Sequence, residues 1–320
     1  MSPAYAFALV GDRTLVNLPR PTYDAIAATG FRRPTFLKAI SQQLQALSRE
    51  SSVKAASRSA RSGGVPGTSG SLSLWFYPLG EHGGLALGEA LLAIAPPLPI
   101  KEIRLEGTEI TSTKITAAMR RGFSGAGLEV LRLMDCQLSE AAFVEMMGAL
   151  PASLEQFSAR GADCGDVGMA ALASALPRMP RLKALWLQSC NTGGSLDVTV
   201  AGWSAFAKGL AHAPALQELD LSGSNLGDAG MAALAPALPS AAALQQVSFE
   251  LCKLTEAGLQ SLAEVLPQLP RLRGLSLFQN AIAQNGPGVA AVNDAVEDRA
   301  EAIGFFVAEY DWNHEALLNE

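Results

Sequence analysis

The chain has 320 residues and a formal net charge of −6, and 49% of its residues are hydrophobic while only 6% are aromatic. This length fits one large domain or two ordinary ones, with enough Leu and Ala to build a sizeable core. No run of 18 or more uncharged apolar residues is present, so the sequence predicts no membrane span. The absence of any Asn-x-Ser/Thr sequon disfavours a secreted protein, and we expect an intracellular one, most simply a cytoplasmic one.

The first 63 residues are basic, whereas the rest of the chain is acidic. They hold nine Lys and Arg against three Asp and Glu, a net charge of +6, which leaves −12 for the remainder. Residues 33–47 have helical spacing, so residues 1–50 are either a small helical unit or a basic arm. An Arg-rich, acid-poor start is also typical of a transit peptide to a mitochondrion or chloroplast, and this alternative stays open. Residues 51–70 are rich in Ser and Gly, which predicts a flexible linker.

A pattern of about 28 residues recurs from residue 100 onward. The pattern Leu-x-x-Leu-x-Leu-x-x-(Asn/Cys)-x-Leu starts at Ile100, Leu128, Leu154, Leu182, Leu216, Leu244 and Leu272. The interval before Leu216 is longer than the others, and residues 193–198 account for the difference as an inserted loop. Such a period predicts a stack of similar structural units, preceded by an irregular first unit at residues 71–99.

Each repeat is predicted to combine a short strand with a helix. In the fifth unit Leu219 and Leu221 alternate as one face of a strand, and Met231 and Leu234 then follow at helical spacing. Pro239 ends the helix because proline lacks the N–H that a continuing helix needs. Stacked units would place parallel strands on the inner wall of a curved array and helices on its outer wall.

The predicted helices also carry start signals. Ser139 and Thr255 stand where an N-cap is expected, since their hydroxyl groups can accept a bond from a free backbone N–H. Acidic residues follow at the helix starts, and they are Glu140, Asp166, Asp228 and Glu256. We expect their charges to interact with the positive end of the helix dipole.

The C-terminal residues 286–320 are predicted to cap the array. They include a helix and a short strand at residues 305–307, and Tyr310 and Trp312 could cover the last open core. Stacked repeats need such caps because the last unit otherwise exposes its apolar side.

Two blocks of the sequence carry a family resemblance. LQELDLSGSNLGDAGMAALAPALP and LQQVSFELCKLTEAGLQSLAEVLP resemble the 28-residue leucine-rich repeats of the ribonuclease-inhibitor-like class, and the resemblance covers about residues 72–313. It implies an α/β leucine-rich-repeat solenoid over residues 71–320, a horseshoe with parallel strands on the concave face and helices on the convex face. The class is a binding platform with many uses, so the resemblance specifies fold more closely than function.

The four cysteines have positions within the repeats that argue against a metal site or a disulfide. Cys136, Cys190 and Cys252 occupy the ninth position of their units, where Ser224 and Asn280 stand in others. A small polar side chain there is expected to bond the backbone between strand and helix. No C-x-x-C spacing occurs, and we expect neither a bound metal nor a cofactor.

The concave face is the main candidate for binding, because strand alternation directs positions five and seven of each repeat toward it. The residues expected to contact a partner there are Arg104, Arg132, Met134, Arg160, Trp186, Gln188, Asp220, Glu250 and Phe278. Arginines lie in the early half, acids in the later half, and an exposed Trp186 is expected between them as an aromatic anchor. The inserted loop with its flank, residues 193–200, is the competing candidate.

No nucleophile elbow, phosphate-binding loop or paired catalytic set occurs, and we therefore expect no enzymatic activity. The leading hypothesis is a protein–protein interaction module or a scaffold subunit of a larger assembly. The resemblance leaves two alternatives open, a GTPase-activating protein of the Ran-activator type and an innate-immune-type sensor or inhibitor. Nucleic-acid binding is the weakest hypothesis, since an acidic body repels phosphates.

Overall fold

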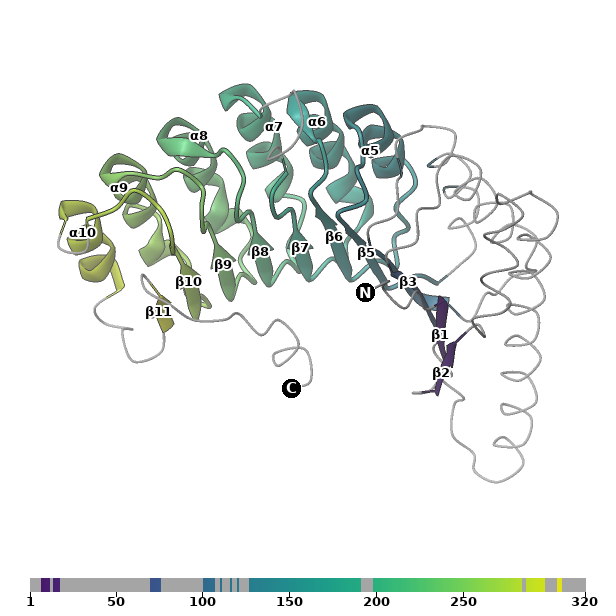
Figure 1. Cartoon of the computed structure of the whole chain (residues 1–320). Coiled ribbons are helices and arrows are strands. Elements are labelled where there is room, and N and C mark those ends of the chain that lie inside the picture. The colour runs from purple at the N-terminus through teal and green to yellow at the C-terminus, as the bar shows by residue number, and fades with distance from the viewer. Residues whose placement is uncertain are drawn as a thin grey trace, which may run out of the picture.

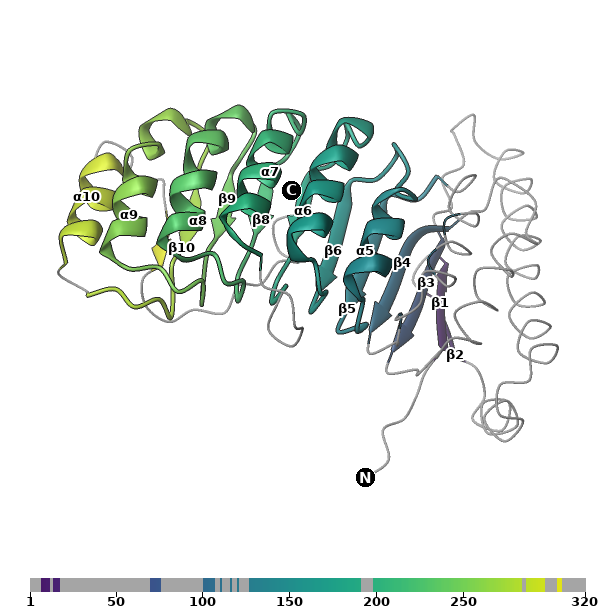
Figure 2. The same ribbon diagram turned by 90° about the horizontal axis from the view of Figure 1, so that it is seen from above.

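The structure is a computed structural model that describes residues 7–11, 14–17, 70–75, 100–106, 110, 116, 120, 127–190, 198–283, 286–296 and 304–306. It has two layers, one continuous sheet and a row of helices that covers one of its faces (Figure 1). Among the described elements, strand and helix alternate from β5 onward, and the helices of successive repeats lie side by side (Figure 2).

The sheet contains eleven described strands in the order β11-β10-β9-β8-β7-β6-β5-β4-β3-β1-β2. The bounds are β1 Phe7–Gly11, β2 Thr14–Asn17, β3 Gly70–Trp75, β4 Ile100–Glu106, β5 Val130–Met134, β6 Gln156–Arg160, β7 Ala184–Trp186, β8 Glu218–Asp220, β9 Gln246–Ser248, β10 Gly274–Ser276 and β11 Gly304–Phe306. All neighbours from β3 to β11 are parallel, whereas β1 is antiparallel to both β2 and β3. The seven strands β4–β10 fall in the seven predicted repeats, which confirms the solenoid architecture.

The helices follow the strands one by one. They are α5 Glu140–Met147, α6 Gly165–Ala175, α7 Val200–Leu210, α8 Gly227–Leu234, α9 Glu256–Ala263 and α10 Pro287–Val296. Short 3-10 turns follow three of them, at η1 Leu176–Arg178, η2 Ala235–Ser240 and η3 Leu266–Gln268. Each turn contains a proline near its start, as expected where an α-helix must stop.

The core lies between the sheet and the helices and runs through every described repeat. Leu185, Leu219 and Val247 stand side by side on neighbouring strands and are at most 1% exposed. The largest fully buried side chains are Trp203, Phe143, Phe157, Phe206 and Phe249. A continuous apolar row of this kind explains why repeats are stable only when stacked.

The ninth position of the repeat forms a ladder of hydrogen bonds, as the sequence predicted. The thiol of Cys190 donates to the carbonyl of Ala159 at 3.3 Å, and the hydroxyl of Ser224 donates to the carbonyl of Leu187 at 3.2 Å. Each donor therefore reaches the sixth position of the preceding repeat. Cys136, Cys252 and Asn280 donate in the same way to Leu105, Leu221 and Phe249.

The eighth position of the repeat is a left-handed turn. The residues concerned have φ between 51° and 72°, and they are Asp135, Gly161, Ser189, Gly223, Leu251 and Gln279. The N–H of one turn donates to the seventh-position carbonyl of the next repeat, for example from Leu251 to Phe278 at 3.0 Å. The turn thus extends the backbone ladder past the ends of the short strands.

Neighbouring helices are linked at their N-terminal ends by carboxylates. Asp166, at the start of α6, accepts hydrogen bonds from the backbone N–H of Thr199 at 2.7 Å and of Gly202 at 3.1 Å, and from the Thr199 hydroxyl at 2.7 Å. Asp228 bonds Thr255 and Gly258 in the same way, and Glu256 bonds Ala283 and Gly288. We call this link the carboxylate clasp. The acidic residues therefore stabilise the dipole of the following helix as well as their own.

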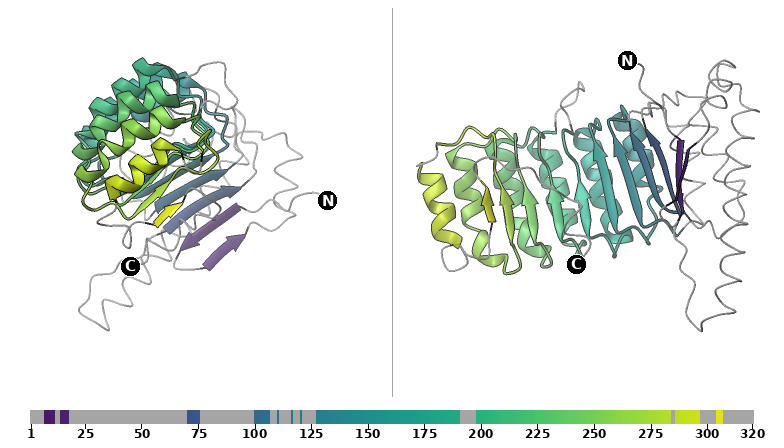
Figure 3. Two further views of the ribbon diagram at one scale, coloured as in Figure 1. Left: turned by 90° about the vertical axis from the view of Figure 1, so that its left-hand side faces the viewer. Right: turned by 60° about the horizontal axis from the view of Figure 1, so that its bottom comes forward.

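The two ends of the sheet can be compared with the predicted first unit and the predicted C-terminal cap. The irregular first unit supplies β3, and the N-terminal segment supplies the pair β1 and β2, which adds to the same sheet (Figure 3). At the other end, β11 pairs with β10 where a strand at residues 305–307 was predicted. The predicted helix at residues 33–47, Tyr310 and Trp312 fall outside the described residues, as does the predicted linker except for Gly70, which begins β3.

Within the described residues, every helix is too short and insufficiently apolar to cross a membrane.

Candidate functional site

The candidate site is the concave face, the face of the sheet that points away from the helices (Figure 1). The parallel register sets the fifth positions of the repeats in one row across it. The row runs Arg104, Arg132, Ser158, Trp186, Asp220, Ser248 and Ser276. Side chains from distant parts of the sequence are therefore neighbours, as strand alternation predicted.

Arg132, Trp186 and Glu218 form a framework of three residues in the middle of the concave face. The guanidinium carbon of Arg132 lies 4.9 Å from the centroid of the Trp186 ring, which is a cation–π contact. The indole N–H of Trp186 donates to Glu218 Oε2 at 3.2 Å, and Arg132 Nη2 donates to Gln156 Oε1 at 3.0 Å. Ser158 stands between Arg132 and Trp186 on β6, and its small side chain lets the two larger ones meet.

The expectation that Trp186 is an exposed anchor is wrong. Its side chain is engaged on both sides by Arg132 and Glu218, and the residue is only 6% exposed. Asp220 is 3% exposed, so it is also covered. Trp186 and Asp220 therefore shape the surface rather than present themselves to solvent.

The acidic half of the face is held by neutral donors among the described residues. Asp220 accepts from the side chain of Gln188 at 2.5 Å and from the backbone N–H of Ser222 at 2.8 Å. Burial raises the pKa of Glu218, and the nearby charge of Asp220 raises it further, whereas the Trp186 N–H and Arg132 act in the opposite direction. The carboxylates are thus fixed in place by a polar network.

Two accessible groups lie at the carboxyl-terminal edge of the sheet, Arg160 at the end of β6 and Leu251 after β9. The Arg160 side chain is 50% exposed, and its Nε lies 3.7 Å from Asp135 at the rim. Leu251, at the eighth position of a later repeat, is 53% exposed although it is a large apolar residue. Its φ of 51° lies in the left-handed region, which leucine rarely adopts. The conformation that exposes this side chain therefore has a cost in backbone strain.

The remaining predicted residues lie on the same face. Arg104 pairs with Glu102 on its own strand. Met134, Gln188, Glu250 and Phe278 are partly buried, and Glu250 accepts a hydrogen bond from the Ser276 hydroxyl. Sequence reasoning missed Gln156 and Leu251. A signal for Leu251 was present, since leucine is unusual at a turn position that holds Asp, Gly, Ser or Gln in other repeats.

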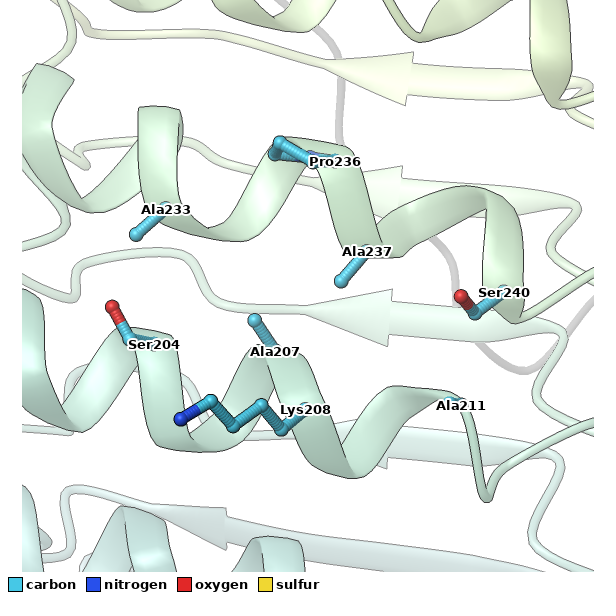
Figure 4. Close-up of a pocket in the computed structure, with 8 residues that line it drawn as sticks. All are labelled: Ser204, Ala207, Lys208, Ala211, Ala233, Pro236, Ala237 and Ser240. Carbon is cyan, nitrogen blue, oxygen red and sulfur yellow. The ribbon is translucent and has the colours of Figure 1, made fainter.

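The structure describes only part of the competing candidate site, residues 193–200. Residues 191–197 fall outside the described residues, and Val198 is buried, while Thr199 caps α7 by accepting from Ala201 N at 3.1 Å. Val200 is 47% exposed. A further hollow lies on the helix side, a groove of about 420 Å³ between α7 and α8–η2 (Figure 4). Four of its eight lining residues are alanines, and one, Lys208, is a cation.

The described site has the chemistry of a recognition surface. Within the described residues, no three His, Cys, Asp or Glu side chains come together as metal ligands would. The four cysteines are buried and free, and burial raises the pKa of the Cys252 thiol to about 12. Two charged groups of the concave face pair with acids, Arg104 with Glu102 and Arg160 with Asp135. Others bond to neutral groups, as Arg132 does to Gln156 and Asp220 to Gln188.

Comparison with known proteins agrees with the repeat architecture. Residues 212–235 match the family described as "Leucine Rich repeat". A segment of 110 residues is 36% identical to ribonuclease inhibitor from Sus scrofa, and it covers 33% of this chain and 23% of that protein. The chain therefore matches about a quarter of the length of this relative.

Two solved structures were also compared. A chain of the crystal structure of the yeast Rad7 and Elc1 complex has 14% identity and a TM-score of 0.27, with 69% of this chain and 71% of that chain covered. An internalin from Listeria monocytogenes has 12% identity and a TM-score of 0.28, with 78% and 84% covered.

Proposed function

Because this chain carries leucine-rich repeats of the ribonuclease-inhibitor-like class, we propose that it is a non-enzymatic module that binds another protein on its concave face. In this proposal the chain acts as an interaction module or as a scaffold subunit of a larger assembly. Repeats of this class build extended surfaces from rigid elements, which favours recognition of a large partner over turnover of a small substrate.

The observation that carries the proposal is that a framework of mutually bonded side chains lies beside accessible residues on the same face. Arg132, Trp186 and Glu218 hold one another across β5, β7 and β8, so the centre of the face is ordered before any partner arrives. Arg160, at the end of β6, and Leu251, which follows β9, are accessible at the carboxyl-terminal edge of the same sheet. A surface that is already ordered loses less conformational entropy on binding, which favours affinity.

Leu251 is the most specific element of the proposed contact. An exposed leucine in a left-handed turn lowers stability through its backbone and gains little from burial of its side chain. Strain of this kind is often found at binding sites, where the surrounding fold compensates for it. We assign Leu251 to the apolar part of the partner contact and Arg160 to the charged part.

The test uses full-length protein and four single variants. Arg160→Glu and Leu251→Asn change the concave face, and asparagine tolerates the left-handed turn. Val167→Asn and Lys208→Glu are matched controls on the helix side, where Val167 is 60% exposed. Partners captured from a lysate are identified by mass spectrometry, and the purified candidate is then titrated against each variant.

We expect each concave variant to weaken binding by roughly tenfold or more, which corresponds to a loss of about 1.4 kcal/mol, while both controls bind as the wild type does. Normal binding by both concave variants would overturn the concave-face proposal. In that case a Val200→Asn variant that loses binding would move the site to the edge formed by residues 193–200.

A further inference from the structure

The seventh residues of four successive repeats form a row at the carboxyl-terminal edge of the concave face. The row runs Arg160, Gln188, Ser222 and Glu250. The backbone joins each member to the next, since the N–H of the residue that follows a member donates to the carbonyl of the next member, at 2.9, 2.6 and 2.7 Å along the row. Each step is therefore close to one strand spacing of about 4.8 Å, and Arg160 and Glu250 lie roughly 14 Å apart.

The first end of the row is an accessible cation. The Arg160 side chain is 50% exposed, and its Nε lies 3.7 Å from a carboxylate oxygen of Asp135, whose side chain is 58% exposed. An ion pair as exposed as this contributes little free energy, so a carboxylate from another molecule can bind the guanidinium at small cost. The N–H donors of a guanidinium match the planar shape of a carboxylate. This end of the row therefore favours an acidic residue of a partner.

The other end of the row is a carboxylate. Glu250 is partly buried and accepts a hydrogen bond from the hydroxyl of Ser276, which is itself buried. This neutral donor fixes the direction of the carboxylate and leaves its charge in place. Among the residues that the structure describes, no Lys, Arg or His forms an ion pair with Glu250. A basic residue of a partner would supply that counter-charge.

Apolar surface lies beside this acidic end. Leu251 follows Glu250 directly and is 53% exposed, and its backbone N–H donates to the carbonyl of Phe278 at 3.0 Å. Phe278 is partly buried at the seventh position of the next repeat. The exposed Lys253 stands at the tenth position of its repeat, after the buried Cys252 and outside the row. The acidic end therefore suits a basic residue that has an apolar neighbour.

The middle of the row is uncharged. The side chain of Gln188 donates to Asp220 at 2.5 Å, and the hydroxyls of Ser222 and Ser248 share a hydrogen bond of 2.7 Å. The turn residue after Ser222 is Gly223, which has no side chain. A polypeptide that lies along the row can therefore bring its backbone close to small neutral groups between the two charged ends.

We propose that the partner presents an extended segment to this row, with an acidic residue at Arg160 and a basic residue, next to an apolar one, at Glu250 and Leu251. In an extended chain, residues four positions apart are about 14 Å apart and point to the same side, which matches the distance between the two ends. The opposite charges favour one direction of the segment across the repeats and disfavour the reverse. This inference rests on the proposed function and adds the chemistry of the partner.

The test selects binders from a displayed library of random 12-residue peptides, using immobilised full-length protein. Arg160→Glu and Glu250→Lys each reverse one end of the row, and Lys208→Glu is the matched control on the helix side. We expect the wild type and the control to enrich peptides with an acidic and a basic residue four positions apart and an apolar residue beside the basic one. Arg160→Glu should exchange the acidic preference for a basic one, and Glu250→Lys should exchange the basic preference for an acidic one, while the other end is unchanged in each.

Titration of one purified wild-type peptide separates this inference from the proposed function. We expect Arg160→Glu, Glu250→Lys and Leu251→Asn each to weaken its binding at least tenfold, and Lys208→Glu to leave it unchanged. A peptide that depends on Arg160 and Leu251 while the selected charges fail to switch would overturn the inference and leave the concave face as the binding site. A peptide whose affinity depends on neither residue would overturn both, and failure of the wild type to enrich any peptide would overturn the inference.

Discussion

The carboxylate of Asp228 in one repeat accepts a hydrogen bond of 3.0 Å from the backbone N–H of Gly258 in the next. The same carboxylate accepts from the backbone N–H of Thr255 at 2.8 Å and from its hydroxyl at 2.5 Å. One side chain thus satisfies the start of a neighbouring helix, where free N–H groups concentrate positive charge. The joint between two repeats depends on this acid as well as on apolar packing.

Replacing this acid should loosen the joint. Asp228→Ala is expected to lower the free energy of unfolding by about 1.5–3 kcal/mol, because hydrogen bonds to a charged group are lost and backbone donors are left unpaired. Asp228→Asn keeps an acceptor and should lower it by less. Urea unfolding measures both, and Asp294→Ala, at an exposed position of α10, is the control that should stay within about 0.5 kcal/mol of the wild type.

Close contact between α6 and α7 makes Gly209 sensitive to size. A Cβ there would lie 2.7 Å from the Cα of Ala173, which is backbone and cannot rotate away. Gly209→Ala should therefore lower the free energy of unfolding by about 1–3 kcal/mol through overpacking, despite the better helix propensity of alanine. Gly127→Ala meets no atom within 4 Å and should be neutral in the same thermal melt. An equal effect of the two changes would contradict this account.

Asn280 makes four hydrogen bonds, three of which join its repeat to the preceding one. Its Nδ2 donates to the carbonyls of Phe249 at 2.7 Å and Leu277 at 2.9 Å, and its Oδ1 accepts from the N–H of Cys252 and Leu254. Asn280→Ala should lower the free energy of unfolding by about 2 kcal/mol or more, since buried backbone groups lose their partners. Ser224→Ala removes one such bond, and a loss as large as that of Asn280→Ala would argue against the count of bonds as the cause.

Glu218 predicts a pH dependence of stability. Burial raises the pKa of this carboxyl above its usual value of 4.5, so the folded state favours the protonated form. Its contribution to stability is complete below pH 4.5 and is lost as the pH rises through the raised pKa. Glu218→Gln keeps an acceptor for Trp186 and removes the charge, so its melting temperature should exceed that of the wild type at pH 7 and the difference should shrink below pH 4.5. A difference that does not change with pH would contradict the assignment.

The cysteines of the native chain should be unreactive. All four are buried, and the pKa of Cys252 is raised to about 12 because burial disfavours the thiolate. Since the thiolate is the nucleophile, we expect almost no reaction with a thiol reagent at pH 8 in the folded state and four equivalents after denaturation. Rapid labelling of folded protein at Cys136, Cys190 or Cys252 would show that the ladder opens readily.

The sequence predicted the parts of the fold that repeat. Equivalents of Leu219 and Met231 recur once in each repeat, and small side chains such as that of Cys190 recur at the ninth position. The strand, the helix and the ladder could therefore be predicted from spacing. Partners across repeats were harder to foresee, because they depend on how far one unit is displaced from the next. Asp166 was expected near the dipole of its own helix, and only the stacking brings it to Thr199.

The candidate site shows the same division. Alternation placed Arg132 and Trp186 on one face correctly, because the direction of a strand side chain is a local property. The exposure of these side chains, in contrast, depends on residues of other repeats. The burial of Trp186 depends on Arg132 from two strands away and on Glu218 from the next strand, and the outward position of Leu251 depends on a turn whose φ the sequence did not reveal.

The ninth-position ladder also determines where this chain tolerates changes in length. Cys190 reaches the Ala159 carbonyl because it is the ninth residue of its repeat, so one residue gained between Leu182 and Cys190 would shift this donor away from its acceptor. The next described link of this repeat to its neighbour is made by Thr199, the N-cap of α7, which bonds Asp166. The additional residues of the longest repeat fall between these two links, and engineered peptides or labels inserted there should leave the stacking on both sides intact.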